Sequence, residues 1–216
     1  MKGIPILLFL LTLSGCICNT APVHQYLLED MVTPATATGA TPRLRGMIVI
    51  GPVSLAAELG SLSIVTRPGP MEIRSSSTRL WAAPLDEQMA AVISRELSIL
   101  LHSDRITVYP GPRFASPRYQ VELAVDRFDG MPGREFTCRL RWSISDLEEG
   151  RMVRSGRFAL TLPVQGTTYR DYVAAASTAL ARLSRKTLAP ALVALAGPHV
   201  RQAPLANMQE RRRENR

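Results

Sequence analysis

Three cysteines and three histidines are the side chains of this chain that most often do chemistry, and they are widely spaced. His24, His102 and His199 stand far from one another, and none has a partner at the interval that a zinc site uses, so we expect no metal. The sequence contains no nucleophile-elbow serine motif, phosphate-binding glycine loop or His-Glu-x-x-His helix. We therefore expect no catalytic residue, no cofactor and no enzyme activity.

Two of the cysteines, Cys16 and Cys18, follow an apolar run at residues 4–13. A lysine precedes this run and two small residues follow it, which is the layout of a secretory signal. The run is about half as long as the roughly 18 apolar residues of a membrane-spanning helix. We therefore predict export. The alternative is a short buried helix with Cys16 as a core thiol.

The residues Leu13-Ser14-Gly15-Cys16 resemble the lipobox of bacterial lipoprotein signals. In such signals the cysteine thiol receives a diacylglycerol, the bond before it is cut, and the new amine takes an acyl chain such as palmitate. Small side chains admit the extended backbone to a narrow peptidase groove, and a thiolate is the nucleophile that can accept the lipid. We predict cleavage between Gly15 and Cys16, with Cys16 lipidated as the anchor of a peripheral lipoprotein.

The composition fits one globular domain, because 46% of the 216 residues are hydrophobic and 20% are charged. The formal net charge is +8, and removal of residues 1–15 takes away only one lysine. An exported basic protein meets anionic lipid headgroups and lipopolysaccharide, so we expect partners of this kind and not nucleic acid.

The hydrophobic pattern predicts an α+β fold, with a mostly antiparallel sheet and two long helices packed on one face. Three successive segments alternate apolar and polar residues, which predicts an antiparallel meander with one covered and one wet side. The meander strands are expected at residues 118–128, 135–145 and around 158–162. Shorter strands are expected at 24–28, 45–53, 62–67, 71–75 and 105–109, and the second of these should end at Gly51-Pro52.

Two helices are predicted from apolar stripes at helical spacing. The first runs from about 85 to 101, and Glu96 lies off its stripe. The second begins after Thr168, which has capping-box spacing with Asp171, and Pro190 should kink or end it.

Arginines gather on the wet side of the predicted meander. Arg139 and Arg141 alternate with the core residues of their strand, and Arg157 joins them in one of the registers open to the next strand. This pattern predicts an anion-binding or partner-docking face. The alternative is a solvated sheet surface with cross-strand ion pairs to Glu122 and Asp126.

Cys138 lies in phase with the apolar residues of the same strand, which predicts a buried free thiol. A disulfide between Cys138 and Cys18 in an oxidising compartment is the alternative.

Beyond the lipobox, several segments follow one another in an order that resembles a known family. They are Tyr26-Leu27-Leu28 and residues 48–53, 79–85, 119–128 and 140–146. The resemblance is to the PqiC or YmbA-type family, auxiliary lipoproteins of ABC-type transport systems that carry an MCE (mammalian cell entry) protein, and it covers about residues 26–188.

This resemblance implies a lipoprotein anchored in the outer membrane and facing the periplasm, which docks on the MCE protein and helps to move lipid between two membranes. It also implies assembly as a homo-oligomeric ring in some members, and it brings no catalytic residues. Ile17, in place of an aspartate after Cys16, favours the outer membrane. A stand-alone periplasmic lipoprotein that binds a lipid or another ligand is the alternative, and it requires an enclosed apolar cavity.

The expected organisation has four parts. They are a lipoprotein signal peptide at 1–15, a lipidated tether at 16–25, an ABC-transport auxiliary lipoprotein domain at 26–196 and a basic, disordered tail at 197–216.

Overall fold

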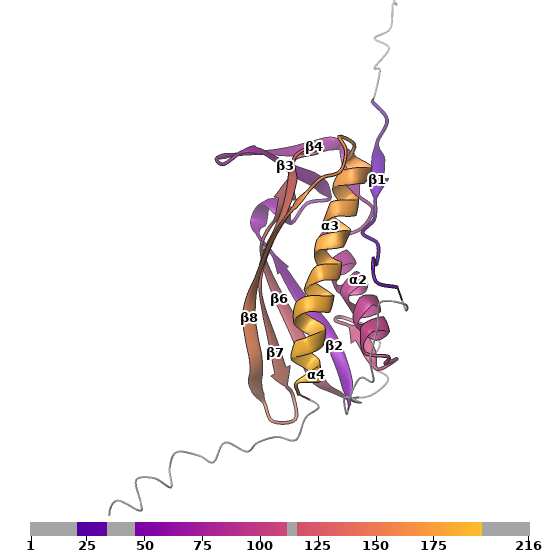
Figure 1. The fold of residues 1–216 in the computed structure, drawn as a ribbon, viewed down its shortest axis with the longest axis vertical. Coiled ribbons are helices and arrows are strands. Elements are labelled where there is room, and N and C mark those ends of the chain that lie inside the picture. The colour runs from indigo at the N-terminus through magenta and orange to yellow at the C-terminus, as the bar shows by residue number, and fades with distance from the viewer. Residues whose placement is uncertain (1–20, 34–45, 112–115, 196–216) are drawn as a thin grey trace, which may run out of the picture.

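A computed structural model describes residues 21–33, 46–111 and 116–195 of the chain. These residues form an α+β fold in which two long helices lie side by side on one face of a sheet (Figure 1). The predicted fold class is confirmed. No helix in the described part of the chain has the length and apolar character needed to cross a membrane.

The larger sheet has five strands in the order β5-β2-β6-β7-β8. Its strands β6, β7 and β8 are the predicted antiparallel meander, whereas β2 pairs in parallel with both β5 and β6. The bounds are β2 Met47–Leu55, β5 Ile106–Val108, β6 Pro117–Gly130, β7 Glu135–Asp146 and β8 Arg151–Pro163.

A second sheet of three strands, in the order β1-β4-β3, lies at one end of the larger sheet (Figure 1). The strands are β1 His24–Tyr26, β3 Ser63–Gly69 and β4 Glu72–Trp81. The expected end of β4 at residue 75 is wrong, because its last three residues, Arg79 to Trp81, pair in parallel with β1. The serines and threonine before Arg79 do not alternate with apolar residues, which hid this part of the strand.

Strand β2 also passes the predicted stop at Gly51-Pro52 and continues to Leu55. Its register against β6 shifts between Ile50 and Val53, and this irregularity accommodates a proline that cannot donate to the ladder. The expectation that β2 ends at this pair is therefore wrong.

Helix α2, Leu85–Leu100, packs on β2 and β5, and helix α3, Tyr169–Leu183, packs on β7 and β8. The predicted capping box begins α3: Thr168 Oγ1 accepts from the Asp171 amide at 3.2 Å, and Asp171 Oδ2 accepts from the Thr168 amide at 3.0 Å. The Thr168 hydroxyl also donates to Asp171 Oδ2 at 2.6 Å, and the hydrogen bonds that this carboxylate accepts from the hydroxyl and the amide of Thr168 lower the pKa of Asp171.

After α3 the chain stays helical beyond the expected break at Pro190. A π-helical segment, Ser184–Leu188, leads into the short helix α4, Ala189–Val193, in which Pro190 occupies the first turn. The π-helical turn is wider than an α-helical one and lies just before Pro190. This proline has no N–H to donate, and its ring crowds the preceding turn. Of the two predicted outcomes at Pro190, a kink or an end, the end is wrong, because the chain is helical on both sides of this proline.

Aromatic rings fill the space between the meander and α3. Phe136 contacts Phe128 and Tyr172 edge to face, with ring centroids 4.8 and 5.2 Å apart. The Tyr172 hydroxyl donates to the Val65 carbonyl at 2.7 Å, which joins α3 to β3. Cys138 is a free, fully buried thiol, as predicted, and burial raises its pKa to about 12.

Candidate docking surface

The strand register places three predicted arginines on one exposed face of the meander. Arg141 on β7 lies directly opposite Arg157 on β8 and opposite Ala124 on β6. Arg139 lies two residues along β7, so its side chain points to the same side. All three side chains are exposed, and the helices cover the other face of the sheet.

Acidic side chains neutralise only part of the positive charge of these arginines. Arg141 Nη2 lies 3.4 Å from Asp126 Oδ1, and both side chains are more than half exposed, at 61% and 54%. Such a pair contributes little to folding. Within the described residues, no carboxylate forms an ion pair with Arg139 or Arg157. The face therefore carries one cross-strand ion pair, as the solvated-surface alternative predicts, whereas the docking role of the arginines stays a prediction.

A shallow hollow of about 530 Å³ lies on this face. Arg141 and Arg157 line it together with Ser143, two residues further along β7, and Glu122, which lies opposite Ser143 on β6. Ser143 donates to Glu122 at 3.3 Å. Positive, negative and hydroxyl groups thus line one open surface, which suits contact with a polar partner.

Polar side chains of both long helices hold the extended segment that enters the fold. The Leu28 amide donates to Gln88 Oε1 at 2.9 Å, and the Met31 amide donates to Glu96 Oε1 at 3.1 Å. The Glu29 amide donates to Ser177 Oγ on α3 at 3.1 Å. We call residues 28–31 the strap. Its amides bind helix side chains and not a neighbouring strand, so the entry to the domain is fixed to its core.

The buried Glu96 carboxyl corrects the predicted helix stripe. Glu96 is 0% exposed, and its second oxygen accepts from Ser184 Oγ at 2.7 Å. Burial raises the pKa of Glu96, and the hydrogen bonds from Ser184 and Met31 partly oppose that effect. The expectation that Glu96 lies off the buried stripe is wrong, because the strap and the π-helical segment cover that side of α2. No pattern in the sequence indicated that the strap and the π-helical segment would pack over Glu96.

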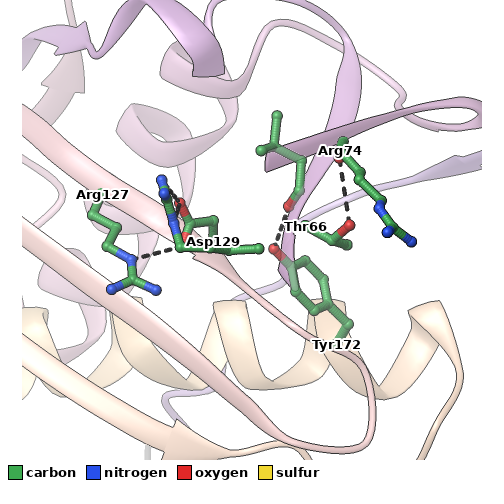
Figure 2. A network of polar contacts seen from close by, with 7 residues as sticks. Thr66, Arg74, Arg127, Asp129 and Tyr172 are labelled. Carbon is green, nitrogen blue, oxygen red and sulfur yellow. Dashed lines mark hydrogen bonds and ion pairs between the residues drawn. The ribbon is translucent and has the colours of Figure 1, made fainter. Parts of the chain in front are cut away.

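A second polar cluster, also not predicted, surrounds Asp129 at the end of β6. Arg67 Nε lies 3.1 and 2.9 Å from the two carboxylate oxygens, and Arg127 Nε donates to Oδ1 at 2.7 Å. Figure 2 shows Arg127 and Asp129 beside the link from Tyr172 to β3. Asp129 is 1% exposed, and its hydrogen bond raises the pKa of Arg67. One buried carboxylate thus orients two guanidinium groups.

The predicted cleavage and lipidation positions, Gly15 and Cys16, lie outside the described residues. Within the described ranges, no three His, Cys, Asp or Glu side chains group as metal ligands.

The fold and its surfaces define a two-layer α+β domain with a pinned entry segment and a charged, exposed sheet face. The chain belongs to the ABC-type transport auxiliary lipoprotein component family, because the sequence model of this family matches residues 26–187. The protein is thus a lipoprotein component of a transport system, in a family of auxiliary components and not of enzymes. No curated protein matches the chain.

Several solved structures are similar to this one, and the two with a TM-score of 0.63 share its fold. An uncharacterized protein is 18% identical with a TM-score of 0.63, and the match covers 80% of this chain and 99% of that one. Protein XCC0632 from Xanthomonas campestris is 22% identical with a TM-score of 0.63, over 79% of this chain and 95% of that one. A PelC dodecamer from Paraburkholderia phytofirmans is 17% identical with a TM-score of 0.43, over 70% of this chain and 94% of that one.

Proposed function

We propose that the mature protein is a lipid-anchored subunit of an intermembrane lipid transport system, held in the outer membrane and facing the periplasm. In this proposal it begins at Cys16, and it acts as a docking and structural component for the MCE protein of the same system. Membership of the transport auxiliary family supports this role. The division into a signal peptide at 1–15, a tether at 16–25, a domain at 26–196 and a tail at 197–216 is part of the proposal.

The observation that carries the docking role is the exposed face with Arg139, Arg141 and Arg157. Arg141 and Arg157 occupy directly paired positions on β7 and β8, and like charges at paired positions repel one another, so an anionic partner that binds both would relieve this repulsion. Arginine also pairs with carboxylates through two parallel hydrogen bonds, which gives orientation as well as attraction. An acidic surface on the MCE protein is the complement that this face requires.

The docking face is tested by charge reversal. We expect the double variant Arg141→Glu with Arg157→Glu to fold normally and to recover at least about tenfold less MCE protein in a pull-down, because attractive contacts become repulsive. Arg182→Glu, on the exposed side of α3, is the matched control and should recover the native amount. Native recovery by the double variant would show that the partner binds elsewhere.

The anchor is tested by metabolic labelling with radioactive palmitate. Cys16→Ala should abolish incorporation, because no other group of the signal can take the first lipid. Cys18→Ala, two residues away, should keep full incorporation. Label in the Cys16→Ala protein would contradict the lipobox assignment.

The proposal includes a homo-oligomeric ring, which mass photometry of the detergent-extracted protein would detect as one discrete multiple of the protomer mass. The stand-alone ligand-binding alternative requires an enclosed cavity between sheet and helices. The Phe128, Phe136 and Tyr172 rings pack against one another in that space, so no observation favours this alternative.

A further inference from the structure

The chain enters the domain at the same end of the molecule as the β3–β4 hairpin. Figure 1 shows β1 and this hairpin together at that end, with the β7–β8 turn at the opposite end. Only seven residues separate Cys16 from His24, and they reach at most about 25 Å when extended. A lipid on Cys16 therefore keeps this end of the molecule close to the membrane surface.

The hairpin presents an apolar side chain at its turn. Gly69 pairs with Glu72, so Pro70 and Met71 form a two-residue turn between the strands. Met71 is 102% exposed, and Ile73 on β4 is 42% exposed. An apolar side chain at the tip of a projecting turn can enter the interfacial region of a membrane without any change in the fold.

Three arginines line a groove of about 480 Å³ beside this turn. Arg67 and Arg127 both donate to the Asp129 carboxylate, which holds their guanidinium groups in place. Figure 2 shows the terminal nitrogens of Arg127 turned away from that carboxylate. Arg134 has no ion-pair partner among the described residues, and Glu135 is the acidic side chain that lines the groove. The guanidinium groups outnumber the carboxylates, and their oriented N–H groups match the oxygens of a phosphate.

We propose that the Met71 turn and this arginine groove form a second membrane contact, in which lipid phosphates bind the arginines and Met71 enters the interfacial region. We call this part of the molecule the membrane tip. The inference rests on the proposed anchor at Cys16, since the short tether brings the tip to the headgroups. Apolar and basic groups at one end of a fold together give interfacial binding that favours anionic lipids.

The test uses the lipidated full chain in vesicles with brominated acyl chains, which quench a nearby tryptophan. The indole introduced by Met71→Trp should show emission that is shifted to the blue and quenched. Met152→Trp, an exposed position at the start of β8 and thus at the opposite end, should show neither effect. Spectra of the unaltered protein provide the background of Trp81 and Trp142.

Charge is tested in the Met71→Trp background. Quenching should be stronger in phosphatidylglycerol than in phosphatidylcholine vesicles, and Arg134→Glu should remove this difference. Arg154→Glu, exposed on β8, carries the same change of charge away from the tip and should leave the difference intact.

Flotation of the vesicles separates the two proposals. If the Met71→Trp protein floats while its introduced indole stays unquenched, the membrane tip is overturned and the anchor stands. A blue shift of that indole only after addition of the MCE protein would assign the tip to a protein contact, and this also overturns it. A protein that does not float overturns the anchor, and with it the premise of the tip.

Discussion

At the scale of single residues, Asp129 shows how much depends on one buried carboxylate. Replacing Asp129 by asparagine leaves Arg67 and Arg127, whose side chains are only 18% and 24% exposed, without their counter-charge. We expect this change to lower the free energy of unfolding by about 3 kcal/mol. Urea denaturation measures the effect. Asp126→Asn, which breaks the exposed pair with Arg141, is the control and should cost less than about 1 kcal/mol. Equal losses in the two variants would show that burial does not set the strength of the cluster.

Glu96 predicts a pH dependence at the same scale. Burial raises its folded-state pKa above the unfolded value. The negative charge of Asp30 raises this pKa a little further, and the positive charge of Arg185 lowers it. The folded state therefore binds more protons between the two values, so the contribution of Glu96 to stability falls as pH rises through this range. As the pH rises above the ordinary titration range of a glutamate, we expect stability to fall less in Glu96→Gln than in the native protein. Parallel pH profiles of the two proteins would contradict this assignment.

At the scale of elements, the strap depends on side-chain hydrogen bonds from the helices. Gln88 accepts from the Leu28 amide and donates to the Ala83 carbonyl at 2.8 Å. Gln88→Ala leaves both backbone groups unpaired, so amide exchange of residues 28–31 should become about tenfold faster. Strand β6 should keep its native exchange. Gln25→Ala changes an exposed glutamine on β1, just before the strap, and should have no effect on amide exchange in the strap. Unchanged exchange in Gln88→Ala would mean that packing alone holds the strap.

The elements also show which parts of the fold can be predicted from the sequence. The meander was predictable because apolar residues alternate with polar ones from Tyr119 to Val125 on β6 and from Phe136 to Ile144 on β7, and this period determines which face is buried. The docking arginines follow from the same alternation, and only the pairing of Arg141 with Arg157 required the structure. The Asp129 cluster joins residues 62 positions apart across two sheets. No local pattern encodes such a contact, and the same holds for the strap, which joins residues 60 to 148 positions apart.

At the scale of the whole molecule, the proposed functions occupy separate regions. The membrane tip lies at the end where the chain enters, whereas the docking face lies on the side of the large sheet that the helices leave open (Figure 1). An anchored protomer can therefore contact lipid and present its arginines to a partner at the same time. The excess of positive charge, formally +8 over the full sequence with only one of these charges in residues 1–15, adds a long-range field to both contacts.

This charge predicts how the association responds to salt. Electrostatic attraction between exposed groups is screened over about 8 Å at physiological ionic strength, so added salt should slow association with the MCE protein and change dissociation little. Surface plasmon resonance over a series of salt concentrations measures both rates. The double variant Arg141→Glu with Arg157→Glu should show a much flatter dependence of the association rate, because its face no longer attracts an acidic surface. Arg182→Glu carries a charge reversal on the helix side and should keep a slope close to the native one. An association rate of the native protein that does not change with salt would exclude steering by this face, and docking would then depend on apolar contacts elsewhere.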